Sequence, residues 1–190
     1  MKSLIFNFVA AALTAFPVAI SAQTVSDSVQ KETAMMQKEV TNKSEMERII
    51  DRSISKVKQE EPETALTCIA EMERITAIYP DSVAPKMHIA QQCLSYAICQ
   101  PQAKQAGEMI EKARQAIAAI EKMPAADVSD LCMLRGFLYT TIIVQDPMKN
   151  GPQYYRDVIE NFEKALKVNP DNKLARELYE RFKEGMRGVR

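Results

Sequence analysis

The stretch Phe162-Glu-Lys-Ala-Leu-Lys-Val-Asn-Pro-Asp-Asn172 contains the pattern that decides the fold. Its first residues continue a helical period, and Pro170 ends the helix because proline lacks a backbone N–H and crowds the preceding turn. The same kind of break occurs at Tyr79-Pro80-Asp81 and at Met123-Pro124-Ala125, so the three prolines are 44 and 46 residues apart. A spacing that recurs within about 20–50 residues indicates stacked supersecondary units.

The segments between these breaks predict helices. Apolar residues recur at intervals of three and four, as in Met46, Ile49, Ile50, Ile54 and Val57, which is typical of one face of a helix. We therefore expect an all-α fold with about seven helices after the leader, at about residues 44–57, 62–78, 83–98, 102–122, 126–144, 152–167 and 172–186. The part of the fifth helix at 131–144 is apolar nearly all round, which predicts the most buried helix.

The last repeat resembles a known family. Phe162, Ala165 and Pro170 stand where the second helix and exit turn of a tetratricopeptide repeat have an aromatic, a small residue and a proline. The resemblance implies stacked antiparallel helix pairs, an α-solenoid, over about residues 43–187, with the specific motif confined to about 158–172. The chain departs from the family in its repeat length of about 45 residues, against about 34, and in lacking the large aromatic early in each first helix.

A second resemblance rests on the segment Asp146-Pro147-Met148 with Gly151 and Tyr154, taken together with the exit turn. It is similar to a group of exported tetratricopeptide-like proteins from Bacteroidota. The same segment has two structural interpretations. It is a tight helix–helix connection in which Gly151 takes a positive φ, or it is a recognition loop.

The N-terminus has the three-part pattern of a secretory signal peptide. Lys2 precedes an apolar run over 4–20, and small residues end at Ala22, after which cleavage is expected. A retained membrane anchor is the alternative. Because no cysteine lies near Ala22, a lipoprotein anchor is not expected. We predict a signal peptide at 1–22, a flexible linker at 23–42 and a helical repeat domain at 43–190, in a periplasmic or secreted protein.

The charge balance argues against a nucleic-acid partner. The whole chain has 25 basic and 25 acidic residues, and removing the leader takes away only Lys2. Proteins that bind nucleic acid usually show a basic excess or a basic stripe. A protein or peptide is therefore the expected partner.

The four cysteines are Cys68, Cys93, Cys99 and Cys132, and their spacing matches no zinc ribbon or CxxC redox motif. They are interpreted as small buried hydrophobic residues. An exported protein can also keep disulfides, and the alternative is one disulfide, such as Cys68 with Cys93.

Few residues suggest reaction chemistry. His88 is the only histidine, and the chain has no GxGxxG, Walker or HExxH motif. We therefore expect no enzyme activity, no cofactor and no metal site.

The family resemblance supplies the functional expectation. In stacked helix pairs of this kind, the first helix of each pair lines a concave groove, and five residues fall on that face by analogy: Met87, Gln91, Arg135, Glu177 and Arg181. The predicted function is a non-enzymatic protein–protein interaction scaffold of the cell envelope that binds a peptide or a partner helix. The alternatives are a structural subunit of an envelope assembly and a small exported enzyme or ligand carrier.

Overall fold

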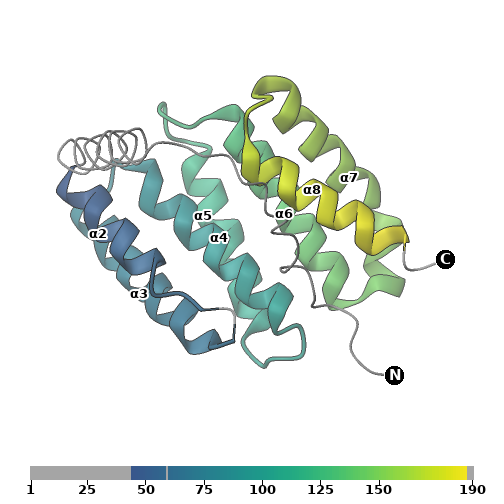
Figure 1. Ribbon diagram of the computed structural model, residues 1–190, viewed down its shortest axis with the longest axis horizontal. Coiled ribbons are helices and arrows are strands. Elements are labelled where there is room, and N and C mark those ends of the chain that lie inside the picture. The colour runs from purple at the N-terminus through teal and green to yellow at the C-terminus, as the bar shows by residue number, and fades with distance from the viewer. Residues whose placement is uncertain (1–43, 59, 188–190) are drawn as a thin grey trace, which may run out of the picture. The chain divides into compact units, whose positions relative to one another are not determined.

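The structure is a computed structural model that describes residues 44–58 and 60–187 (Figure 1). These residues form seven α-helices and no β-strand, which confirms the all-α prediction for this part of the chain. The predicted signal peptide at 1–22 and linker at 23–42 lie outside the described residues. The helices are α2 Glu45–Ile54, α3 Pro62–Ile78, α4 Val83–Cys99, α5 Ala106–Ile120, α6 Val128–Gln145, α7 Pro147–Val168 and α8 Lys173–Arg187.

Helices that follow one another in the chain pack side by side, from α2 and α3 at one end to α7 and α8 at the other (Figure 1). The most extensive contacts join α6 to α7 and α4 to α5, followed by α3 to α4. Contacts that skip one helix join α4 to α6 and α6 to α8. Of the helices described, none is both long and apolar enough to cross a bilayer.

Helix α6 is the most buried helix, as its sequence predicts. It contacts α4, α5, α7 and α8, so apolar residues on nearly every side of it are covered. The strand-favouring residues near its C-terminus are helical, and the Thr141 hydroxyl donates a hydrogen bond to the Phe137 carbonyl inside the same helix. Tertiary burial therefore overrides the local preference of β-branched residues for strands.

The contact between α6 and α7 depends on a glycine facing an aromatic ring. Phe162 is fully buried, and a Cβ built on Gly136 would lie 3.0 Å from two carbons of its ring. Ala165, one turn further along α7, is also fully buried, and its carbonyl accepts a hydrogen bond of 2.9 Å from the Ser129 hydroxyl. Small residues on both helices allow the backbones to approach closely.

Asn172 connects the start of α8 to the start of α6. Its side-chain oxygen accepts a hydrogen bond from the Ala175 backbone N–H at 3.0 Å, as a helix N-cap does. Its amide nitrogen donates to the Ser129 hydroxyl and to the Asp130 carboxylate, both at 3.0 Å. One buried side chain therefore caps α8 and fixes its position against α6.

The prediction that a helix starts near Pro152, after a connection with Gly151 at positive φ, is wrong, because α7 begins at Pro147. Asp146 alone connects α6 to α7, and its carboxylate accepts from the Lys149 backbone N–H as an N-cap. Gly151 is helical and does not adopt a positive φ. Its missing Cβ removes part of the steric conflict that Pro152 imposes on a helical predecessor. The segment is a tight helix–helix connection and not a recognition loop.

Two further expectations need correction. Residues 101–105 form turns, so α5 starts at Ala106 rather than near Gln102. The cysteines are all unpaired, so the alternative disulfide between Cys68 and Cys93 is not formed in the structure. Cys68, Cys93 and Cys132 are buried as expected, whereas Cys99, the last residue of α4, is exposed.

We expect Gly136→Ala to destabilise the protein by about 1–2 kcal/mol, because the new methyl group overpacks the Phe162 ring. Gly107→Ala in α5 is the matched control. A Cβ there meets no atom within 4 Å, so the better helix propensity of alanine stabilises by up to about 1 kcal/mol. Urea unfolding followed by circular dichroism measures both changes. A Gly136→Ala variant as stable as Gly107→Ala would contradict the close-packing argument.

Candidate partner-binding surfaces

The five residues predicted to line a groove lie on α4, α6 and α8. Met87 and Gln91 are half-buried in the first part of α4, where Met87 packs against the hydrophobic core. The Gln91 side-chain oxygen lies 3.1 Å from Nδ1 of His88. Neither residue is fully available at the surface.

Arg135, Glu177 and Arg181 form ion pairs within the protein. Both Nε and Nη2 of Arg135 donate to the Glu121 carboxylate just after α5, at 3.0 and 2.7 Å. Glu177 and Arg181 pair along α8. Exposed pairs of this kind contribute about 0.5 kcal/mol each, so a charged partner could displace them. Of the five residues, Glu177 and Arg181 form an ion pair with each other.

Burial shifts the pKa values of two candidate reactive groups. Burial lowers the pKa of His88, with a smaller opposing effect from its contact to Gln91. Burial also raises the pKa of the Cys93 thiol to about 12, so this thiol stays protonated near neutral pH. Within the described residues, no three His, Cys, Asp or Glu side chains gather closely enough to hold a metal ion.

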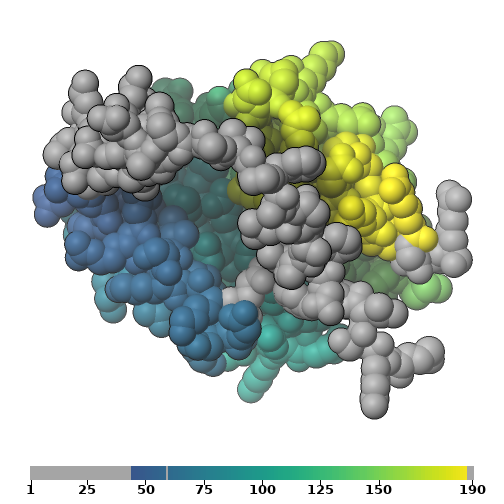
Figure 2. All heavy atoms as spheres, in the orientation of Figure 1, coloured from purple at the N-terminus to yellow at the C-terminus, as the bar shows by residue number. Residues whose placement is uncertain are grey.

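A separate surface lies along α2 and α3. We call it the α2–α3 groove and define it as an open depression of about 320 Å³ with eight lining residues. Helix α2 contributes Ile49, Arg52 and Ser53, the turn after it contributes Lys56, and helix α3 contributes Glu71, Arg74, Ile75 and Ile78. A second open depression continues from Ile78 to the N-terminal turn of α2 at Met46. Figure 2 shows α2 and α3 (blue) at the end of the helix array away from α7 and α8 (yellow-green).

The floor of the α2–α3 groove exposes apolar area. Ile78 is 69% exposed and Ile49 is 39% exposed, although both belong to the apolar faces of their helices. The sequence identified the apolar stripe on α2. It did not show that α3 covers only part of that stripe, because coverage depends on how far α2 extends and where the two helices cross.

Three cations border the α2–α3 groove, namely Arg52, Lys56 and Arg74, against one carboxylate, Glu71. None of the ion pairs formed among the described residues includes these three cations. The groove therefore combines an apolar floor with a rim of positive charge that the rest of the described chain does not neutralise.

Ser53 gives the groove a buried polar group. Ser53 is 2% exposed, and its hydroxyl oxygen lies near the Cys68 thiol but forms no well-aligned hydrogen bond with a described residue. Burial raises the pKa of the Cys68 thiol, and the nearby Ser53 hydroxyl partly offsets this rise. A buried unpaired hydroxyl costs free energy in the isolated protein.

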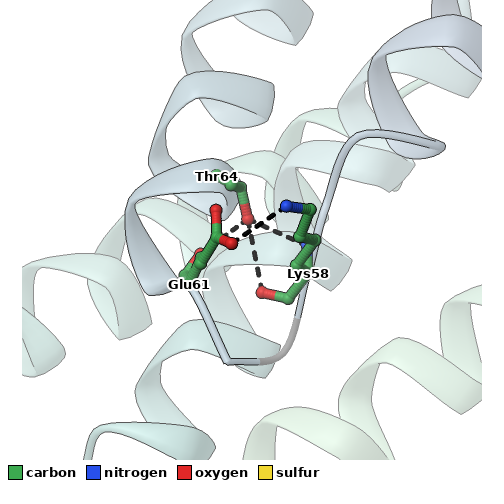
Figure 3. Close-up of polar contacts among 3 residues, drawn as sticks. All are labelled: Lys58, Glu61 and Thr64. Atoms are coloured by element: carbon green, nitrogen blue, oxygen red, sulfur yellow. Dashed lines mark hydrogen bonds and ion pairs between the residues drawn. The ribbon is translucent and has the colours of Figure 1, made fainter.

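The turn between α2 and α3 is held by the Thr64 hydroxyl (Figure 3). This oxygen accepts from the Lys58 backbone N–H at 2.9 Å and lies 2.6 Å from the Glu61 carbonyl, to which it donates. Lys58 and Glu61 also form an ion pair of 2.9 Å and an isolated backbone bridge. These contacts fix the turn that connects α2 to α3.

Comparison of this chain with protein-family models, with curated proteins and with solved structures finds no match. The assignment of binding surfaces therefore rests on the sequence pattern and on the geometry described above.

We expect Ser53→Ala to stabilise the protein by about 1 kcal/mol, because it removes a buried hydroxyl whose one polar neighbour among the described residues is the weakly bonding Cys68 thiol. Ser129→Ala is the matched control, since Ser129 is also fully buried but donates to Ala165 and accepts from Asn172. That variant should lose about 1–3 kcal/mol. Thermal and urea unfolding measure the two changes, and equal destabilisation by both substitutions would show that Ser53 has a partner.

Proposed function

We propose that this protein is a non-enzymatic protein–protein interaction scaffold built from stacked, tetratricopeptide-like helix pairs. The observation that carries the proposal is the order of helix contacts. The extensively packed pairs α4–α5 and α6–α7 follow one another, and contacts that skip one helix join α4 to α6 and α6 to α8. Stacked pairs of this kind bury a continuous core between neighbouring units and leave long surfaces available for partners.

The packing of the last complete pair supports the resemblance to tetratricopeptide repeats. Phe162 fills the space between α6 and α7 against Gly136, and Ala165 allows the close approach one turn later. Pro170 follows the end of α7, and α8 begins at Lys173. These are the roles that the family resemblance assigns to the aromatic, the small residue and the proline.

The surface offers more for partner binding than for catalysis. The Cys93 thiol is buried and stays protonated near neutral pH, and the half-buried His88 contacts Gln91 at Nδ1, with the Asp51 carboxylate acting on its pKa only weakly. General acid–base or nucleophilic catalysis requires such groups to be accessible and suitably paired. The helices instead present charged side chains in weak surface pairs that a partner can replace.

The predicted signal peptide places the scaffold outside the cytoplasm, in the periplasm or secreted. Its partner is then an envelope or secreted protein, bound as a peptide or a helix. The face of α4, α6 and α8 that contains Met87, Gln91, Arg135, Glu177 and Arg181 is the proposed concave surface. A structural role in an envelope assembly would use the same scaffold to form large homo-oligomers.

Site-specific photo-cross-linking in the native cell tests this face. We expect a photoreactive residue at Gln91, Arg135 or Arg181 to capture a protein partner. The control positions are Arg114 on α5 and Lys164 on α7, which are exposed on the second helices of the pairs and should capture none. Equal yields from both sets, or none from either, would contradict a partner-binding face on α4, α6 and α8. Capture of the same chain in large assemblies would instead favour the structural role.

A further inference from the structure

The α2–α3 groove follows one face of two helices. On α2 it is lined by Ile49, Arg52 and Ser53, spaced as i, i+3 and i+4, and Lys56 continues the line in the turn after the helix. The α3 residues are spaced as i, i+3, i+4 and i+7, which places them on a single face of that helix. The result is an open depression in which exposed isoleucines lie among charged side chains, a surface on which an amphipathic helix can place its apolar side.

The position of the groove in the helix array explains why it is open. The pairs α4–α5 and α6–α7 each have a preceding helix packed against them, namely α3 and α5 respectively. The pair α2–α3 is the first pair among the described helices, and α3 packs against α4. Among the described helices, none packs over Ile49 and Ile78. These apolar side chains are therefore exposed, as expected at the end of a helix array that no further unit covers.

The charges on the rim indicate which helix fits. Elsewhere in the array, cations between neighbouring helices have carboxylate partners, such as Lys112 of α5 with Glu73 of α3 at 2.7 Å. The rim cations Arg52, Lys56 and Arg74 form no such ion pair with another described residue. A partner that carries carboxylates beside its apolar stripe would neutralise them, and such complementarity gives an interface its specificity.

A second copy of this chain fits the same surface poorly. In a two-fold symmetric dimer the same patch lies on both sides of the interface. Arg52, Lys56 and Arg74 would then face the identical three cations, against a single Glu71 on each side. Charge repulsion therefore disfavours self-association through the groove.

We infer that the α2–α3 groove binds an acidic amphipathic helix of a partner protein. The apolar face of that helix packs on Ile49 and Ile78, and its flanking carboxylates pair with Arg52, Lys56 and Arg74. This surface is distinct from the five residues of the proposed function, so either can fail without the other.

The probe for the test is a fluorescein-labelled synthetic peptide of about 18 residues, long enough to form a helix on binding. It has leucine at i, i+3, i+4 and i+7 and glutamate beside the leucines, and a second peptide has lysine in place of every glutamate. Fluorescence anisotropy with the full protein measures both dissociation constants. We expect the acidic peptide to bind at least about tenfold more tightly than the basic one, and this preference to shrink between about 50 mM and about 500 mM salt.

Two charge-reversal variants locate the binding surface. Arg52→Glu/Arg74→Glu should weaken binding of the acidic peptide at least about tenfold, and Ile78→Asp should weaken it comparably. The control Arg48→Glu/Arg114→Glu changes the net charge equally at exposed positions on α2 and α5 outside the groove, and should change affinity less than about twofold. Circular dichroism checks that each variant retains its helices.

The outcomes separate this inference from its competitors. Equal binding of the two peptides, or equal effects of the groove and control variants, would overturn it. Light scattering that shows a dimer of the unmodified protein, dissociated by Ile78→Asp, would assign the groove to a second copy and also overturn it. If photoreactive residues at Gln91 and Arg181 capture no partner while the acidic peptide still binds, the proposed concave face is wrong and this inference stands.

Discussion

The close approach of α6 and α7, with the Phe162 ring against Gly136, is the constraint on which the rest of the structure depends. It fixes the most extensive helix pair, and α6 is the helix that contacts α4, α5 and α8 as well. A side chain at position 136 would push α7 away and carry the Ser129, Ala165 and Asn172 hydrogen bonds with it. Packing density in a core of this kind leaves little space to absorb such a shift.

Polar side chains at the N-termini of three helices then define where these helices begin. Asp127, Asp146 and Asn172 cap α6, α7 and α8, and each accepts from a backbone N–H near the start of its helix. Asn172 differs from the other two because its amide also donates to residues at the start of α6. The caps define the first residue of each helix. Because Asp146 caps α7 directly after the last residue of α6, this single residue can connect the two helices.

Apolar side chains are covered most completely in the middle of the helix array, around α6. Both ends expose apolar residues, Ile49 and Ile78 on α2 and α3, and Met148 and Tyr155 on α7. Exposed apolar area alone therefore does not distinguish the α2–α3 groove. Its distinguishing feature is that three cations, which form no ion pair with another described residue, border the exposed isoleucines.

The sequence by itself determined the helical class, most helix boundaries and the most buried helix, because periodicity and proline breaks are local signals. It misplaced the start of α7, since Asn150 and Gly151 resemble a turn until the Asn150 amide is seen donating to the Ile142 carbonyl at the end of α6. The tertiary structure was needed to show which apolar residues stay exposed and which cations form no ion pair among the described residues. Those properties depend on what lies across from a residue in space, and a helical period reports only which residues share a face.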